Sequence, residues 1–373
     1  MIKKVVRIVL WTLAILLVIT GSLAYYVSRQ MGSLDSLEDR KARFSGLAYY
    51  DAEDDAFISP EPLPYFPEQT TGGDPGPLRF FKTSPNAPEF PLPKQMITKS
   101  DFSETPSDFA ALWIGHSSFI LELDGKRILF DPVFENGGPL PFILRRFDVS
   151  PIKREELPEI DLVVITHDHY DHLEASTMRF LASRNTEFLV PLGVGARLES
   201  WGIQKNNISE LGWHEAKTVG SLQITALPGI HYTSRSFNDR NKTLWASFVI
   251  KGDEKNLFIS GDTGYGSHLK DIGDEYGPFD LAFVEIDGWN KGWPLTHLFP
   301  DEVIQLCQDI DTQLMFPIHW GVFDLALHPW DESIQMVAEL AAENDIKMVT
   351  PIMGERIIPG LSPTNKWWEN LKK

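Results

Sequence analysis

The sequence predicts an α/β (α+β) protein in which β-sheets are covered by helices, preceded by one N-terminal membrane-spanning helix. A long run of uncharged apolar residues lies near the N-terminus, short apolar runs typical of strands recur from residue 111 to residue 318, and helical patterns lie between several of them. We expect three segments: a membrane anchor over residues 1–30, an acidic connector with a proline-rich wrapping segment over residues 31–106, and a folded domain over residues 107–373.

The anchor is predicted from residues Ile8 to Val27, which include no charged side chain. A helix of this length spans about 30 Å, the thickness of a bilayer's hydrocarbon core. Lys3, Lys4 and Arg7 precede the run, so we expect a cytoplasmic N-terminus and a domain on the extracytoplasmic (periplasmic) side. The alternative is a cleaved signal peptide, for which Ser22-Leu23-Ala24 is a weak cleavage site.

The segment between anchor and domain changes composition twice. Residues Gln30 to Asp55 are polar and acidic, and we expect them to connect the domain back to the membrane surface. From Ser59 to Pro106 the chain is rich in Pro, Gly and Phe, which predicts little regular structure. We expect this segment to wrap the domain through aromatic side chains, among them Phe80, Phe81 and Phe90.

The domain itself is predicted to begin with a meander of strands that turns at Gly115 and at Asp124-Gly125. Its expected strands are 111–115, 118–123, 127–130, 162–165, 188–190, 222–226, 244–250, 257–259, 281–284 and 314–318. Its expected helices are 174–183, 193–201, 301–310 and 331–343.

Composition excludes some classes of function. The formal net charge of −18 argues against a nucleic-acid-binding protein, which would present a basic face. Cys307 is the single cysteine of the sequence, so neither an intramolecular disulfide nor a cysteine-based zinc site can form. It falls in an expected helix, where we interpret it as a buried, inert thiol.

The strongest signal for chemistry follows the strand predicted at 162–165. A polar turn delivers His167, His169, Asp171 and His172 within six residues. In an extended segment His167 and His169 point to the same side, which suits two imidazoles on one metal ion. The two later residues can then reach a second metal ion as the chain turns into a helix.

Three further residues at the ends of apolar runs complete a two-metal site. They are His231, Asp262 and His319, with Asp262 placed to bridge the two ions. Nitrogen and oxygen donors without thiolate favour two divalent ions, with Zn²⁺ expected and iron or manganese as alternatives. His116 and Asp131 end the early strands, and we interpret them as residues that orient the ligands by hydrogen bonds.

These residues, in this order, resemble the metallo-β-lactamase superfamily, whose hallmark is the motif His167-x-His169-x-Asp171-His172 followed by three downstream ligands. Within it the chain is most similar to the N-acyl-phosphatidylethanolamine-hydrolysing phospholipase D family. The similarity runs from about Phe80 to about Ile358 and includes Trp113–Phe119, Phe130–Phe134, Asp239–Trp245 and Ile318–Phe323.

The resemblance implies an αββα sandwich, with the site at one edge of two sheets, and a hydrolase domain over residues 107–373. It implies a phospholipase D-type phosphodiesterase in which a metal-bridging hydroxide attacks a phospholipid, and it also implies a homodimer. Asp262 would be catalytic as the bridging ligand. His297 resembles the family's substrate-contacting histidine, with charge stabilisation or proton delivery as its role and a purely supporting role as the alternative.

The chain departs from the family near the substrate side, at Asp287-Gly288-Trp289 and at Thr296 and Leu298, so the preferred lipid does not carry over. A lactonase or other ester hydrolase of the same fold is therefore the main alternative. A nuclease and a non-enzymatic metal-binding scaffold are weaker ones. Trp289, Trp293 and Phe299 could line a lipid-facing groove or belong to the core, and Trp367-Trp368 could pack back or touch the membrane.

Overall fold

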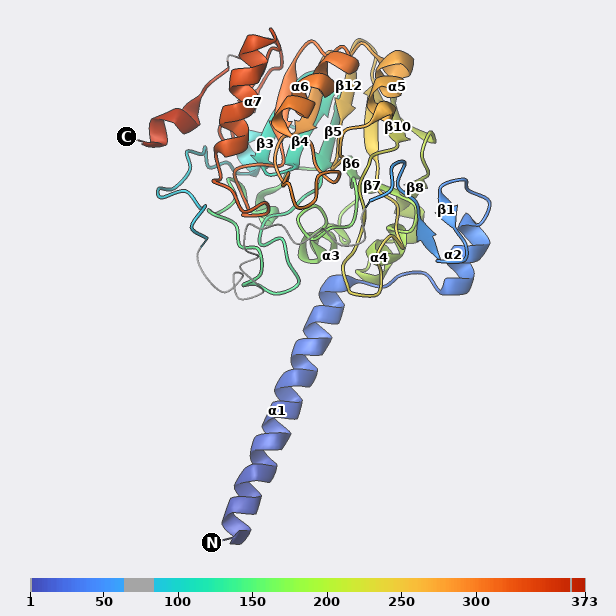
Figure 1. Ribbon diagram of the computed structural model, residues 1–373, viewed down its shortest axis with the longest axis vertical. Helices are drawn as coiled ribbons and strands as arrows, with labels where there is room; N and C mark the ends of the chain where they lie inside the picture. The colour runs from blue at the N-terminus through green and yellow to red at the C-terminus, as the bar shows by residue number, and fades with distance from the viewer. Residues whose placement is uncertain (1, 64–83, 363, 373) are drawn as a thin grey trace.

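A computed structural model describes residues 2–63, 84–362 and 364–372 of the 373-residue chain. Helix α1 (Ile2–Met31) projects away from a folded domain (Figure 1). Residues Lys3–Met31 are long and apolar enough to cross a membrane, and an 18-residue window within them has a mean hydropathy of 2.2. None of that window is buried against the rest of the protein, which is the arrangement expected of an anchor rather than a core helix.

The domain contains two large mixed sheets. The seven-stranded sheet has the order β15-β3-β4-β5-β6-β7-β8, antiparallel from β15 to β5 and parallel from β5 to β8. The six-stranded sheet has the order β14-β13-β12-β11-β10-β9, parallel from β14 to β12 and antiparallel from β12 to β9. A separate two-stranded hairpin is formed by β1 (Tyr50–Asp51) and β2 (Ala56–Phe57).

The element bounds follow the apolar runs of the sequence. The strands of the seven-stranded sheet are β3 (Phe109–Gly115), β4 (Ser118–Leu123), β5 (Lys126–Phe130), β6 (Leu162–Val164), β7 (Glu187–Pro191), β8 (Ile208–Leu211) and β15 (Arg356–Ile357). Those of the six-stranded sheet are β9 (Ala216–Val219), β10 (Leu222–Leu227), β11 (Ser247–Lys251), β12 (Asn256–Ile259), β13 (Leu281–Glu285) and β14 (Met315–Ile318). The helices after α1 are α2 (Leu37–Phe44), α3 (Ala175–Leu181), α4 (Gly195–Ser200), α5 (Ser267–Tyr276), α6 (Pro300–Asp309) and α7 (Glu332–Glu343). Short 3₁₀ turns are η2 (Lys99–Asp101), η3 (Arg154–Glu156), η4 (Lys205–Asn207) and η5 (Trp367–Lys372).

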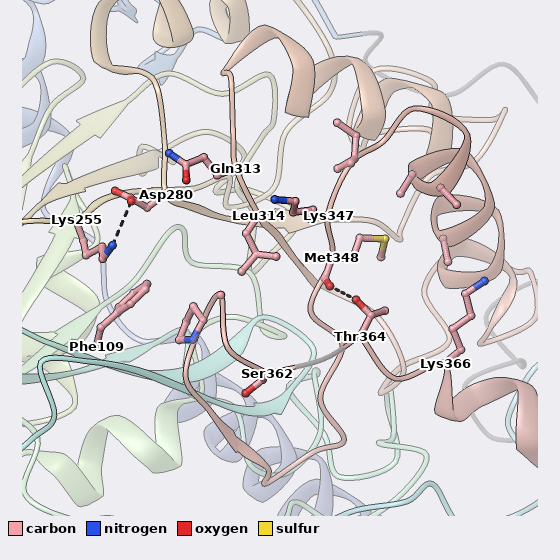
Figure 2. Close-up of a pocket in the computed structure, with 16 residues that line it drawn as sticks. Phe109, Lys255, Asp280, Gln313, Leu314, Lys347, Met348, Ser362, Thr364 and Lys366 are labelled. Carbon is pink, nitrogen blue, oxygen red and sulfur yellow. Dashed lines mark hydrogen bonds and ion pairs between the residues drawn. The ribbon is translucent and has the colours of Figure 1, made fainter.

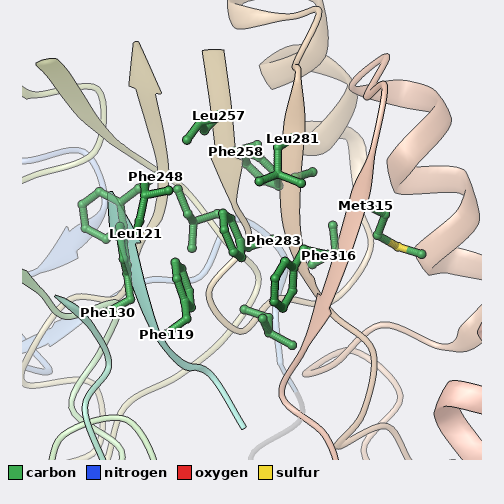
Figure 3. Packing of buried hydrophobic residues seen from close by; sticks show 14 of the residues in the cluster. Phe119, Leu121, Phe130, Phe248, Leu257, Phe258, Leu281, Phe283, Met315 and Phe316 are labelled. Carbon is green, nitrogen blue, oxygen red and sulfur yellow. The ribbon is translucent and has the colours of Figure 1, made fainter. Parts of the chain in front are cut away.

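Burial on both faces of each sheet produces the αββα sandwich that was predicted. In β4, Phe119 and Leu121 face the other sheet, while Ile120 faces the cluster formed with α3 and α4. Figure 3 shows the interface between the sheets, where the Phe119 and Phe283 rings stack 4.1 Å apart. Helices α5, α6 and α7 contribute to the same large core from the outer face of the six-stranded sheet (Figure 1).

Every predicted strand and helix overlaps an observed one, and Asp124 and Gly125 both have the positive φ of the predicted hairpin turn. Cys307 is buried in α6, as predicted. The prediction missed α2, α5, β8, β9, β15 and the β1–β2 hairpin.

The segment expected to be a connector contains regular structure that packs on the domain. Helix α2 and the hairpin place Phe44, Tyr50 and Phe57 in the large core, and Arg40 Nε donates to Asp55 Oδ1 over 3.0 Å. The polar composition hid this packing, because a few apolar residues on one face are sufficient to attach a short helix.

Phe90 of the proline-rich segment does not pack on the domain, contrary to the prediction that the aromatic side chains of this segment would do so. This side chain is exposed, and Leu92 and Ile97 are the buried residues in the described part of that stretch. Phe80 and Phe81 lie outside the described residues. At the C-terminus, Trp367 and Trp368 pack back into the core, where Trp367 stacks on Trp320 at 5.3 Å.

Candidate metal centre

The ends of several strands meet at one edge of the sandwich and carry the predicted site. His167 to His172 follow β6, His231 follows β10, Asp262 follows β12 and His319 follows β14. Because β12, β13 and β14 are parallel, as are β5, β6 and β7, their carboxyl ends and the loops after them lie at the same edge. All seven predicted ligands come together there.

The first group consists of His167, His169, His231 and Asp262, whose potential ligand atoms lie within 4.8 Å of one another. His167 Nε2 lies 2.9 Å from His169 Nδ1, and His231 Nε2 lies 3.2 Å from the same atom. Asp262 Oδ2 is 3.7 Å from the Nε2 atoms of His167 and His231. Three imidazoles and one carboxylate therefore face a single point.

The second group consists of Asp171, His172 and His319, together with His116, again within 4.8 Å. Asp262 Oδ2 lies 3.2 Å from the Nε2 atoms of both His172 and His319. This carboxylate therefore stands between the two groups, which is the place of a bridging ligand.

Contacts outside the two groups hold the imidazoles in one orientation. The Nδ1 atom of His172 pairs with Asp131 at 2.8 Å, and that of His231 with the carbonyl of Thr296 at 2.9 Å. His319 Nδ1 lies 3.2 Å from the carbonyl of Asp287. With each Nδ1 donating to an oxygen, each Nε2 lone pair points into the centre.

Asp131 and His116, predicted to orient ligands, make such contacts. Asp131 accepts from the backbone N–H of Thr166 at 2.8 Å as well as pairing with His172. His116 Nε2 lies 3.1 Å from Asp171 Oδ2. Both residues have positive φ, 54° for His116 and 38° for Asp131, a conformation that side-chain-bearing residues adopt at a cost and that tends to occur at functional sites.

The residues present fit divalent cations. The buried atoms His172 Nε2, His319 Nε2 and Asp262 Oδ1 have no hydrogen-bond partner among the described residues, although buried polar atoms normally have one. Burial alone would raise the pKa of Asp262, but His172, His319 and His167 hold it well below its usual value. Conversely, the carboxylates of Asp262 and Asp171 overcome the effect of burial and raise the pKa of His172. The centre therefore stabilises positive charge and supplies unpaired donor atoms to bind it.

Glu285 was missed by the sequence prediction. It ends β13, is fully buried, and its Oε2 lies 2.6 Å from Nδ1 of His297. Burial and the nearby Asp262 raise the pKa of Glu285, and burial lowers that of His297 to about 4, so both shifts favour neutral forms. Gly288, at φ 89°, packs so closely on the His297 ring that a Cβ would lie 2.9 Å from the ring's Cγ. The ring is thus fixed from two sides.

A cavity of about 410 Å³ opens over the centre. His169, Asp171, Asp262 and His297 form part of its lining, with Tyr170, Tyr232, Ser234, Arg240, Trp293, Leu325, Gly137 and Gly288. Within the described part of the chain, Arg240 is the one arginine or lysine of this lining, and its guanidinium lies over the Tyr232 ring at 4.3 Å. Of the three aromatics considered for a groove, Trp293 lines the cavity, whereas Trp289 stacks on His328 at 4.5 Å. Phe299 packs against Trp289.

Comparisons with known proteins agree with this geometry. A Beta-lactamase superfamily domain matches residues 126–320. The chain is 37% identical over 297 residues to a protein of Mycobacterium tuberculosis, with 78% of each chain covered. It is 31% identical over 283 residues to N-acyl-phosphatidylethanolamine-hydrolyzing phospholipase D 1 of Caenorhabditis elegans, covering 71% of this chain and 79% of that relative. A solved structure of a metallo hydrolase from Ignicoccus hospitalis shares the fold, with a TM-score of 0.53, 20% identity and coverage of 67% of this chain and 97% of that one.

Proposed function

The chain belongs to the beta-lactamase superfamily of metal-dependent hydrolases, and on that premise we propose that it is a membrane-anchored phosphodiesterase of the phospholipase D type. Its substrate would be N-acyl-phosphatidylethanolamine or a related phospholipid. The relative from Caenorhabditis elegans supports this choice, since its name states that activity.

Two divalent ions, most simply Zn²⁺, would be held by the residues that the structure brings together. His167, His169 and His231 would bind one ion, and Asp171, His172 and His319 the other, with Asp262 between them. When bound, such ions lower the pKa of a water molecule and polarise the phosphoryl group.

The remaining roles fall to side chains that line the cavity. Arg240 would bind a non-bridging phosphate oxygen, because guanidinium groups match the charge and geometry of phosphate. Glu285 engages Nδ1 of His297, which leaves Nε2 of that ring to face the head group. We assign His297 to protonating the leaving oxygen or stabilising its charge as the bond between phosphorus and that oxygen breaks.

The proposal of a lipid substrate is supported above all by the position of one segment, residues 232–240. It lines the cavity with Tyr232, Ser234 and Arg240, and Arg235 Nη2 donates to the backbone carbonyl of Gln30, at the end of α1, over 2.6 Å. The cavity that we propose to bind phosphate is therefore joined by this segment to the end of the candidate membrane span. Lys3, Lys4 and Arg7 at the other end of α1 favour an extracytoplasmic domain, which a reporter fused after Lys373 would test.

The test uses the full chain in detergent, loaded with zinc, and N-acyl-phosphatidylethanolamine in mixed micelles in ¹⁸O-labelled water. We expect phosphatidic acid carrying one ¹⁸O atom and an unlabelled N-acylethanolamine, because attack at phosphorus leaves the water oxygen on the phosphate. Metal analysis of the same sample reports the identity and number of ions. If the metal-loaded protein leaves the phospholipid intact but hydrolyses lactones, this proposal is wrong and the lactonase alternative is favoured. The homodimer implied by the family resemblance stays a prediction, tested by the mass of the solubilised protein.

A further inference from the structure

We propose that the loop of residues 234–240 is a second membrane contact, in which Phe237 enters the lipid interface beside α1. Phe237 is fully exposed, whereas Arg235 and Asp239 on either side of it are buried. A single exposed apolar side chain is ordinary on a protein surface, so the position of Phe237 relative to α1 is the observation that matters.

The loop presents Phe237 from a fixed backbone. Asp239 Oδ1 accepts hydrogen bonds from the backbone N–H groups of Arg235 at 3.0 Å and of Ser236 at 2.7 Å. Tyr170, from the metal-binding motif, donates its hydroxyl to the carbonyl of Arg235 over 2.9 Å. The exposed ring therefore projects from a turn whose two ends are joined through Asp239 and which is attached to Tyr170 at Arg235.

The same loop is attached to the end of α1. A helix leaves its last four carbonyls without partners inside the helix, and here side chains of the domain supply donors for three of them. Trp201 Nε1 donates to Arg29 over 3.0 Å, Arg235 Nη2 to Gln30 over 2.6 Å, and Arg197 Nη1 to Met31 over 2.8 Å. Figure 1 shows α1 leaving the domain beside α3 and α4. The height of the loop relative to α1 is thus set by direct contacts.

The position of the loop along the axis of α1 coincides with the expected membrane boundary. The uncharged run ends at Val27 and Arg29 is the next charged residue, so the boundary lies within about one helical turn of Gln30. Phe237 is two residues from Arg235 along the chain, a reach of at most about 7 Å. Aromatic and arginine side chains are both favoured at this interfacial depth.

Seating Phe237 in the interface has a consequence for the cavity. Tyr232, Ser234 and Arg240 of the same segment line it, so the opening would lie at the level of the lipid head groups. A phospholipid could then reach the centre without leaving the bilayer. The inference rests on α1 crossing a membrane but not on which bond is cleaved.

The test measures depth in the bilayer with single cysteines that carry a fluorophore. The full chain is reconstituted in phosphatidylcholine vesicles whose acyl chains carry nitroxide quenchers. Labels are placed by Phe237→Cys, by Leu17→Cys within α1, and by Leu361→Cys. Leu361 is an exposed residue whose neighbours Gly360 and Ser362 lie at the opposite edge of the sheets, and the native Cys307 is buried.

We expect strong quenching at positions 17 and 237 and little at 361. Quenching at 17 without quenching at 237 would overturn this contact while leaving the anchor in place. An unquenched label at position 17 would overturn both the contact and the anchored form of the proposed function. Because no substrate is present, neither result depends on catalytic activity.

Discussion

The two ends of the sandwich both carry a cavity, and the larger one is not at the metal centre. A cavity of about 600 Å³ lies where β3, β12, β13 and β14 begin, against about 410 Å³ where the parallel strands end. Figure 2 shows the larger cavity. Lys255 pairs there with Asp280 at 3.3 Å, and the Thr364 hydroxyl donates to the carbonyl of Met348. These polar groups satisfy one another.

The smaller cavity differs in chemistry rather than size. Asp262 in its lining has a buried carboxylate oxygen without a hydrogen-bond partner among the described residues, and the imidazoles of His172 and His319 beside Asp262 each have an unpaired Nε2. His116, Asp131 and His319 have positive φ. Buried polar atoms without hydrogen-bond partners and strained backbone both cost free energy, so a fold keeps them where another interaction, such as ligand binding, offsets that cost. What distinguishes this candidate functional end is therefore its cluster of unpaired histidine and aspartate ligand atoms, rather than the volume of its cavity.

Matched carboxylates at the two ends give the largest expected contrast. Asp262→Asn should lower hydrolysis by roughly a thousandfold, the upper range for removing one preorganised electrostatic group, and should reduce the metal content. Asp280→Asn, at the residue before β13, should leave both unchanged. Equal loss of activity in the two variants would contradict the assignment of the functional end. Rates and metal content are measured on the same preparations.

Removal of the cavity's arginine should have a smaller and more selective effect. Arg240→Gln is expected to lower kcat/KM for a phosphodiester by about a hundredfold, as the loss of a charge-assisted contact in a catalytic site does. A neutral lactone or ester should be affected much less, because it presents no anionic phosphate. A similar loss on both substrates would show that Arg240 acts on structure rather than on phosphate.

Removing the carboxylate that holds His172 should weaken metal binding, with an effect smaller than that of the Arg240 substitution on phosphodiester hydrolysis. Asp131→Asn replaces the carboxylate that pairs with His172 Nδ1, and such changes typically cost about 10- to 100-fold in metal affinity. Competition with a chromophoric chelator measures this effect. An unchanged affinity would mean that Thr166 alone is sufficient to orient the ligands.

The smallest effect is expected at the larger cavity. Lys255→Gln breaks a partly exposed ion pair, which should change the free energy of unfolding by less than about 1 kcal/mol and leave hydrolysis intact. Chemical denaturation and the lipid assay report the two quantities. A large loss of activity would assign the larger cavity a role that its paired polar groups do not indicate.

The sequence predicted the ligands better than their surroundings, for a physical reason. His167 to His172 are close along the chain, and each later ligand follows an apolar strand, so local pattern and donor chemistry were enough. Glu285 also ends a strand, but a single carboxylate has no spacing partner that would distinguish it from a solvated one.

Contacts between distant segments were beyond local pattern altogether. Arg197 meets Met31 and Asp168, and Arg235 meets Gln30, across separations that no periodicity encodes. Strands β8 and β9 were missed because their residues are mostly half-exposed and lack an apolar run. Helix α2 was missed because its charged residues outnumber its apolar ones.

The attachment of α1 also decides where a soluble version of this protein can begin. A chain starting at residue 42 would lack the carbonyls of Arg29, Gln30 and Met31, and it would lack Arg40, the partner of Asp55. Each buried donor left without an acceptor costs about 1 to 3 kcal/mol. A chain starting just after Ala24 would keep all of these groups. The boundary between anchor and domain for protein engineering therefore falls inside α1, several residues before the helix ends.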